Sequence, residues 1–233
     1  MKESVKRNYH QNAVETFMRE RFSHQPWEFA LPEGHGHETY FVCNQEEKFF
    51  IKLGSLIERY REVASIGLTP TILAAGLLED GTSIIIQPYI AGRNPSRRDY
   101  HTHLEQIAEI IRRTHHSPTV QAVLPSASSE LYQVVGSEAL NRIRQRWEPR
   151  RPQVPEVAEF VDDSLVYLAR QIQLFQGTGL VASHNDICNA NWLVSPDGRL
   201  YLIDLESMSL DDPALDIGAT LWWYYPPQLR QRF

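Results

Sequence analysis

The stretch that decides the fold is SHNDICNANWLV, residues 183–194, in which Asp186 and Asn191 stand five positions apart. A turn sequence, SPDG, separates it from the apolar stretch RLYLIDLE at 199–206, which predicts a strand. Asp204 comes at the end of that predicted strand. The spacing therefore places three polar side chains at a loop and a strand end, immediately before a predicted helix.

These three side chains match the requirements of phosphoryl transfer. That reaction needs a cation for the phosphates, carboxylate and amide oxygens to hold Mg²⁺, and a carboxylate that accepts the proton of the attacking hydroxyl. A turning loop can hold Asp186 toward the hydroxyl while Asn191 reaches back to the metal, and Asp204 can face the same cation. Each residue alone could be a solvated carboxylate or a turn cap, but their common register favours a functional site.

A family resemblance rests on these motifs. The patterns HxDxxxxN at 184–191, IDxE at 203–206 and DIG at 216–218 resemble the aminoglycoside phosphotransferase and choline kinase-like family of small-molecule kinases. The resemblance implies an α+β, protein-kinase-like fold of two lobes, with a small antiparallel sheet in the N-terminal lobe and a mainly helical C-terminal lobe.

The resemblance also implies a role for each polar residue. Asp186 would be the catalytic base, and Asn191 and Asp204 would be the Mg²⁺ ligands. Asp216 would brace the catalytic loop from a helix. We expect His184 to pack and form hydrogen bonds within the loop rather than transfer protons.

The loop departs from the commonest family pattern at three positions. The family usually has a glycine after the histidine, and a proline and a glycine before the asparagine. This chain has Asn185, Asn189 and Ala190 there. The substitutions leave the predicted base and metal ligands in place.

Outward from this stretch, the N-terminal residues predict a helix and a mostly antiparallel sheet, which we assign to a nucleotide-binding lobe over 1–92. Helical spacing of apolar residues and runs of β-branched and aromatic residues carry the prediction. The predicted segments are a helix at 9–22, strands at 39–43 and 48–53, a helix at 57–67, and two strands within 71–92.

The same half supplies candidates for phosphate binding. GHGHETYFV looks like the nucleotide-covering loop of the family, where Gly34 and Gly36 would let backbone N–H groups approach the phosphates. Lys52 stands where kinases place the strand lysine that pairs with the phosphates. A helix glutamate should orient this lysine, and we expect Glu58 in that role, with Glu62 as the alternative.

The segment IIIQPYIAG resembles the hinge between the lobes, so backbone groups of Pro88, Tyr89 and Ile90 would bind adenine. Helical patterns dominate after it and predict a C-terminal lobe over 93–233, which contains the catalytic and metal-binding loops. The clearest of these helices are predicted at 104–116 and 156–175.

Composition limits the other function classes. A net charge of −6 and a pI near 5.8 argue against a nucleic-acid partner. No segment has the roughly 18 continuous apolar residues of a membrane helix, so we expect a cytoplasmic protein without a membrane partner. An acidic surface suits a cationic acceptor. The sequence leaves the oligomeric state open.

The leading prediction is a Mg²⁺-dependent kinase that moves the terminal phosphate of ATP or GTP to a hydroxyl of an aminoglycoside, choline or ethanolamine, or a sugar. Four consecutive aromatic residues at 222–225 suit an aromatic cage for a quaternary ammonium, but core packing is favoured because they point in different directions. The family continues for several helices past DIG, whereas this sequence stops at RQRF, so we expect an incomplete C-terminal lobe. The alternative is a catalytically inactive nucleotide-binding module with a regulatory or interaction role.

Overall fold

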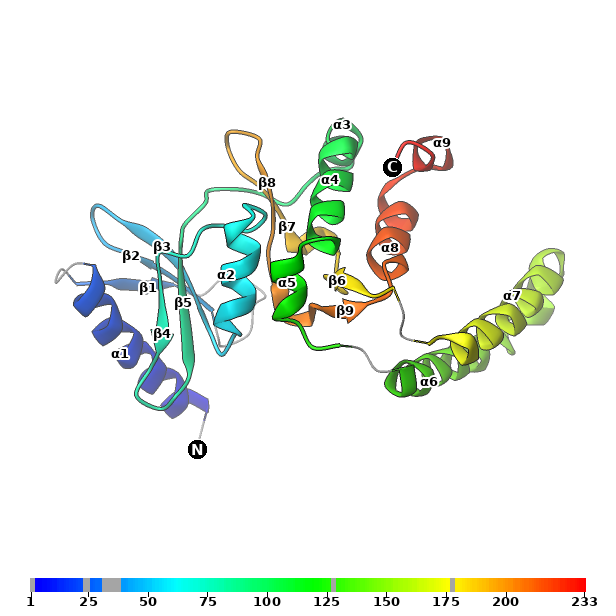
Figure 1. Ribbon diagram of the computed structural model, residues 1–233, viewed down its shortest axis with the longest axis horizontal. Helices are drawn as coiled ribbons and strands as arrows, with labels where there is room; N and C mark the ends of the chain where they lie inside the picture. The colour runs from blue at the N-terminus through cyan, green and yellow to red at the C-terminus, as the bar shows by residue number, and fades with distance from the viewer. Residues whose placement is uncertain (1–2, 23–25, 31–38, 127–128, 177–178) are drawn as a thin grey trace.

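The computed structural model describes residues 3–22, 26–30, 39–126, 129–176 and 179–233. Its N-terminal half is built on a five-stranded antiparallel sheet, drawn in blue to green in Figure 1. The strand order is β1-β2-β3-β5-β4. The strands are β1 (Glu28–Ala30), β2 (Thr39–Cys43), β3 (Lys48–Leu53), β4 (Ala74–Leu77) and β5 (Ser83–Pro88).

Both faces of this sheet are covered, because alternate residues of a strand point to opposite sides. Ile84 and Ile86 pack with the helix α1 (Glu3–Arg21) in one apolar cluster. Ile85 belongs to a second cluster, which includes the helix α2 (Ile57–Ser65) and much of the C-terminal half. The sheet therefore forms the boundary between two hydrophobic cores.

The C-terminal half consists of helices with two short strand pairs (Figure 1). Strand β6 (Val181–Ser183) pairs with β9 (Ser209–Asp211), and β7 (Trp192–Val194) pairs with β8 (Leu200–Leu202). The helices are α3 (Arg97–Thr102), α4 (Leu104–His115), α5 (Pro118–Ala122), α6 (Ser129–Trp147), α7 (Pro155–Leu174), α8 (Ala214–Tyr224) and α9 (Pro227–Arg230). The predicted contrast between a sheet-rich N-terminal half and a mainly helical C-terminal half is confirmed.

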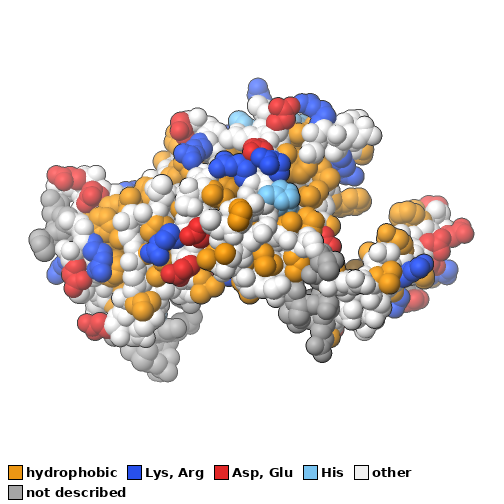
Figure 2. Space-filling view, in the orientation of Figure 1, with side chains coloured by type: hydrophobic (Ala, Val, Ile, Leu, Met, Phe, Trp, Pro, Cys, Tyr) orange, Lys and Arg blue, Asp and Glu red, His pale blue; other side chains and the backbone are white. Residues whose placement is uncertain are grey.

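Helices α6 and α7 form a hairpin that projects from the rest of the molecule (Figure 1). Apolar side chains are exposed on α7, among them Phe160, Val166 and Tyr167, and the orange atoms over this hairpin in Figure 2 show the same character. Among the described residues, no helix has the combination of length and apolar character that a membrane crossing requires.

Two predicted elements differ from the structure, and one helix was not predicted. The first helix begins at Glu3 rather than residue 9, and α6 was not separately predicted. The predicted strand at 199–206 ends at Leu202, because Asp204 adopts a left-handed backbone with φ of 59°. A strand cannot continue through that conformation, and a short 3₁₀ helix, Leu205–Ser207, follows.

Candidate functional site

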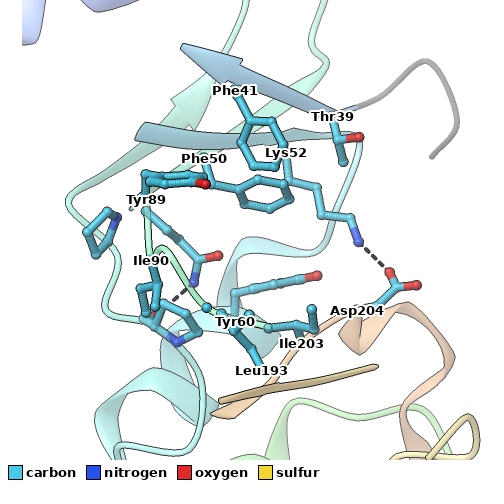
Figure 3. Close-up of a pocket in the computed structure, with 14 residues that line it drawn as sticks. Thr39, Phe41, Phe50, Lys52, Tyr60, Tyr89, Ile90, Leu193, Ile203 and Asp204 are labelled. Carbon is cyan, nitrogen blue, oxygen red and sulfur yellow. Dashed lines mark hydrogen bonds and ion pairs between the residues drawn. The ribbon is translucent and has the colours of Figure 1, made fainter. Parts of the chain in front are cut away.

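A cavity of about 200 Å³ lies between the sheet and the C-terminal half. In Figure 3 the rings of Phe41 and Phe50 lie on one side of it, and Leu193 and Ile203 lie on the opposite side. The walls are largely apolar, which suits a flat aromatic group between them. The remaining lining residues are Thr39, Lys52, Tyr60, Pro70, Gln87, Pro88, Tyr89, Ile90, Gly92 and Asp204.

The predicted hinge residues lie along this cavity. Pro88, Tyr89 and Ile90 all line it. The backbone nitrogen of Tyr89 donates to the carbonyl of Lys48 at 3.1 Å, which continues the β3–β5 pairing beyond the end of β5. The segment is therefore held against the sheet and lines the cavity. The predicted Gly34 and Gly36 lie outside the described residues.

Lys52 extends from β3 toward the segment that follows β8 (Figure 3). Its Nζ lies 2.5 Å from Oδ1 of Asp204 and 2.5 Å from Oε2 of Glu206. Burial opposes the charged form, but Tyr60 and the two carboxylates outweigh it and raise the pKa of Lys52 above its ordinary value. The side chain is consequently a cation at neutral pH.

The expected pairing of Lys52 with Glu58 is wrong. Glu58 lies on the outer side of α2, where its side chain is 66% exposed and 3.6 Å from Arg61. The preceding sequence does not fix the rotation of the helix, and the residues that α2 turns inward are Arg59, Tyr60 and Val63. Glu62 is only partly buried, and within the described residues the acidic partners of Lys52 come from the segment after β8.

Glu206 is the centre of a small polar cluster beneath β3. Its carboxylate accepts hydrogen bonds from the hydroxyls of Ser55, at 2.5 Å, and Tyr60, at 3.0 Å, in addition to the Lys52 ammonium. Arg59 donates to the backbone carbonyl oxygens of Leu205, at 2.9 Å, and Glu206, at 2.6 Å. The hydroxyl of Tyr60 and the guanidinium of Arg59 thereby attach helix α2 to the segment after β8.

Asp204, the predicted metal ligand, follows β8 at the edge of the cavity. Its left-handed backbone turns the carboxylate toward Lys52 and the cavity. The ammonium of Lys52, which donates to this carboxylate, holds the pKa of Asp204 well below its ordinary value. The carboxylate is therefore ionised across the physiological range.

The structure brings Asp186 and Asn191 together in the loop after β6. The amide nitrogen of Asn191 donates to Oδ2 of Asp186 at 3.0 Å and to the backbone carbonyl of the same residue at 2.7 Å. Asp186 is exposed, whereas Asn191 is buried. This arrangement presents one carboxylate to solvent from a loop that is anchored by a buried amide.

Asp216, on α8, braces this loop as the resemblance implied. Its Oδ2 accepts from the backbone nitrogen of His184 at 2.8 Å, and its Oδ1 accepts from that of Asn185 at 3.0 Å. His115, on α4, contributes a third contact, with Nε2 2.8 Å from Oδ2 of Asp216. Burial disfavours the Asp216 carboxylate, but the His115 and His184 hydrogen bonds outweigh burial and lower its pKa.

Asn185 explains how the loop tolerates the absence of the family's glycine. Its φ is 63°, in the left-handed region that glycine adopts readily and asparagine tolerates better than most residues. Its side-chain nitrogen donates to the carbonyl of Ser207 at 3.1 Å and to the hydroxyl of Ser209 at 2.7 Å. The asparagine therefore keeps the backbone conformation and adds an attachment to β9.

Two hydrogen bonds connect the Asp186 loop to the Asp204 segment. The backbone nitrogen of Ile203 donates to the carbonyl of Asn191 at 2.9 Å. The carbonyl of Ile203 accepts from Nε2 of His184 at 3.1 Å, so that nitrogen carries the proton. His184 is fully buried and connects the two segments, in agreement with the structural role expected for it.

The donor set fits Mg²⁺. Because the amide nitrogen of Asn191 faces Asp186, its oxygen is the atom that can ligate a metal, and Asp204 supplies an ionised carboxylate. The described residues contain no cluster of three or more His, Cys, Asp or Glu side chains that could enclose a metal. Proteins commonly bind Mg²⁺ through one or two side chains together with substrate phosphates, so two oxygen ligands suffice.

A second cavity, of about 370 Å³, lies beside the Asp186 loop, between α3 and α8. Its lining includes Asn189, Arg97, Trp223 and Tyr224. Burial raises the pKa of Tyr224. Asn189 belongs to the same loop as Asp186, so this cavity adjoins that loop.

The aromatic residues at 222–225 divide between the core and the surface. Tyr225 is buried, and Tyr224 stacks on Tyr100 with ring centroids 4.0 Å apart. Trp222 and Trp223 are 69% and 70% exposed, so the expected core packing is wrong for these two side chains. Helical rotation separates the four residues, as their consecutive positions predicted, but it turns only two of them inward.

Several functional candidates were missed by sequence reasoning. Tyr60 and Ser55 belong to no motif, and only their contact with Glu206 identifies them. His115 pairs with Asp216 across 101 positions of sequence. Their signal in the sequence is weak because each is an ordinary residue of a helix or loop.

Comparisons with known proteins agree with this geometry. Residues 30–233 match the model of the phosphotransferase enzyme family. Choline kinase LicA from Streptococcus pneumoniae superposes with a TM-score of 0.59 at 18% identity, over 96% of this chain and 78% of that chain. The GDP complex of aminoglycoside 2'-phosphotransferase-IIIa superposes with a TM-score of 0.58 at 17% identity, over 93% of this chain and 78% of that chain.

Spectinomycin phosphotransferase APH(9)-Ia, solved with ADP and spectinomycin, gives a TM-score of 0.56 at 15% identity, over 88% of this chain and 71% of that chain. At such identities the likeness shows the fold, which is the protein-kinase-like fold that the motifs predicted. The match of the family model extends over both the sheet and the loop that carries Asp186. The chain belongs to the phosphotransferase enzyme family.

Proposed function

We propose that this protein transfers the terminal phosphate of ATP or GTP to a hydroxyl group of a small molecule. The observation that carries the proposal is the joined set of Asp186, Asn191 and Asp204, which comes from two segments connected through Ile203. This set stands next to a cation, Lys52, at the end of a cavity suited to a flat base. Few other reactions need this combination.

The nucleotide would enter with its base in the apolar cavity. The rings of Phe41 and Phe50 would contact one face of the base, and Leu193 and Ile203 the other (Figure 3). The carbonyl of Pro88 and the backbone nitrogen of Ile90 would bind its edge, because the Tyr89 nitrogen is already bonded to β3. This orientation directs the phosphates toward Lys52.

Lys52 would bind the phosphates as a fixed cation. Its position is determined by Asp204 and Glu206 before any nucleotide arrives, so little reorganisation is required. Asn191 and Asp204 would hold Mg²⁺ at the same end of the cavity. The metal would neutralise charge on the phosphate oxygens during transfer.

Asp186 would orient the acceptor hydroxyl and take its proton. The carboxylate is exposed, and its loop is braced by Asp216, so it can contact a substrate without losing its position. The second cavity, beside the loop, is the place where we propose the acceptor lies. Aminoglycosides, choline or ethanolamine, and sugars are the acceptor classes to examine.

The test combines binding and turnover. Calorimetry with ATP and GTP in Mg²⁺ measures nucleotide binding, and a panel of these acceptors with γ-labelled nucleotide measures transfer. We expect binding, transfer to at least one acceptor, and loss of transfer in Asp186→Asn but not in the surface variant Asp163→Asn. Nucleotide binding without transfer to any acceptor, and no effect of Asp186→Asn, would favour the catalytically inactive nucleotide-binding module instead.

A further inference from the structure

Gln87 is a buried polar side chain at the inner end of the nucleotide cavity. It follows three consecutive isoleucines in β5 and is only 3% exposed. It also lines the cavity proposed for the base. A buried amide lowers the stability of the folded protein unless its polar atoms form hydrogen bonds. The partners of the Gln87 amide therefore need to be identified.

One half of this amide is fixed by the protein. Nε2 of Gln87 donates to the backbone carbonyl of Pro70 at 2.6 Å, in a buried hydrogen bond. A carbonyl oxygen can only accept, so the amide nitrogen must face Pro70. If the amide rotated by half a turn, its oxygen would face the carbonyl oxygen of Pro70, and the two acceptors would repel each other. The remaining atom, Oε1, therefore belongs to a fixed hydrogen-bond acceptor in the cavity wall.

The sheet register places this acceptor beside the base. Gln87 pairs with Phe50, and two positions along, Ile85 pairs with Lys52. Phe50, Lys52 and Gln87 all line the cavity, so they share one face of the sheet. Gln87 also directly precedes Pro88, the first of the proposed hinge residues. Its amide thus lies where the edge of the base meets the hinge.

We propose that Gln87 makes this protein selective for adenine nucleotides over guanine nucleotides. Adenine carries an exocyclic amine at position 6, which can donate one hydrogen to Oε1 of Gln87 and the other to the hinge carbonyl. Guanine and hypoxanthine carry a carbonyl oxygen at the same position, which leaves the buried acceptor unpaired and facing another acceptor. The inference rests on the proposed function and deepens it by choosing between ATP and GTP.

The test measures the binding of ADP, GDP and IDP by calorimetry. IDP carries the position-6 carbonyl oxygen of guanine without its 2-amino group, and comparison of the wild type with Gln87 variants isolates the part of the preference that Gln87 supplies. Wild-type protein should bind ADP at least about tenfold more tightly than IDP or GDP. In Gln87→Met, which preserves the length of the side chain, this preference should fall by about tenfold, chiefly through weaker binding of ADP.

Gln87→Leu provides a second apolar variant if the methionine variant does not fold, and thermal unfolding checks both. Equal binding of ADP and IDP by the wild type, or a full ADP preference in a folded Gln87 variant, would overturn the inference and leave the proposed function intact. If the wild type bound none of the three nucleotides, both proposals would fail.

Discussion

The ammonium of Lys52 lies 2.5 Å from Oε2 of Glu206, a residue that follows a strand end rather than one that helix α2 carries. Glu206 also accepts hydrogen bonds from Ser55 and Tyr60. The lysine on β3 is therefore oriented by the same segment that carries Asp204. As a result, one short stretch of chain determines both the position of the cation and that of the proposed metal ligand.

Glu206→Gln should weaken nucleotide use, because the neutral amide replaces one of the two carboxylates that hold Lys52. We expect kcat/KM for the nucleotide to fall by about tenfold or more, since a hydrogen bond between charged groups contributes more than a neutral one. Steady-state kinetics at saturating acceptor checks this. Glu58→Gln is the matched control and should leave kcat/KM unchanged. A larger loss in Glu58→Gln than in Glu206→Gln would show instead that Glu58 orients Lys52.

Asp216→Asn should destabilise the folded protein by about 2–4 kcal/mol at neutral pH, because a buried carboxylate with three hydrogen-bond donors is replaced by an amide. Urea unfolding measures the difference. Asp163→Asn, a substitution at an exposed position of α7, should change the free energy of unfolding little.

The effect of Asp216→Asn on the free energy of unfolding should depend on pH. The pKa of Asp216 is lower in the folded protein than its ordinary value of 3.8, so the carboxylate contributes stability that is fully present above that value. This contribution is lost as the pH falls through the folded-state pKa. The difference in unfolding free energy between wild type and Asp216→Asn should therefore shrink as the pH falls below about pH 4. A difference that grew as the pH fell below about pH 4 would contradict this assignment.

Gly92→Ala should disturb the floor of the nucleotide cavity. A Cβ atom at this position would lie 2.6 Å from Cδ1 of Leu193 and 2.7 Å from the carbonyl oxygen of Val194. That carbonyl accepts from the nitrogen of Arg93, so it cannot move away freely. We expect a loss of about 1–3 kcal/mol in the free energy of unfolding, together with weaker nucleotide binding.

Gly218→Ala serves as the comparison for that substitution. Gly218 lies in α8, and a Cβ atom there would meet no neighbouring atom within 4 Å. Alanine in a helix should leave the stability unchanged or raise it by up to about 1 kcal/mol. Thermal unfolding of both variants, with and without nucleotide, distinguishes steric crowding at the cavity from a general intolerance of substitution.

Asn191→Ala should remove most of the effect of Mg²⁺ on nucleotide binding. In the wild type, Mg²⁺ should raise the affinity for ATP, and chelation should reverse this. The variant lacks the amide oxygen proposed as a ligand, so its affinity in Mg²⁺ should approach that in EDTA. The metal-free affinity of the variant should match that of the wild type, which is the internal control. An undiminished Mg²⁺ effect would exclude Asn191 as a ligand.

The sequence predicted the parts of the site whose relative positions are fixed by short spacing. Asp186 and Asn191 share one loop, and Asp204 follows a neighbouring strand, so the hairpin between β7 and β8 is enough to bring the two segments into contact through Ile203 and Asn191. The antiparallel sheet could also be predicted, because alternating aromatic and β-branched residues indicate which faces of its strands are buried.

The parts that could not be predicted depend on helix rotation and on long-range packing. Glu58 and Glu62 both stand on α2, and no local pattern indicates which residues turn toward Lys52; Arg59 and Tyr60 occupy that side. The contact of His115 with Asp216 joins α4 to α8. Gln87 became a candidate only when its hydrogen bond to Pro70 was known.

The central claim is that Asp186 is the base for phosphoryl transfer, and one comparison tests it most directly. The rate of product formation and the affinity for ATP in Mg²⁺ are measured for wild type and Asp186→Asn, with an acceptor that the wild type phosphorylates. We predict a loss of at least about a hundredfold in kcat, with ATP affinity changed by less than about threefold. Wild-type turnover in a folded Asp186→Asn protein would contradict the account.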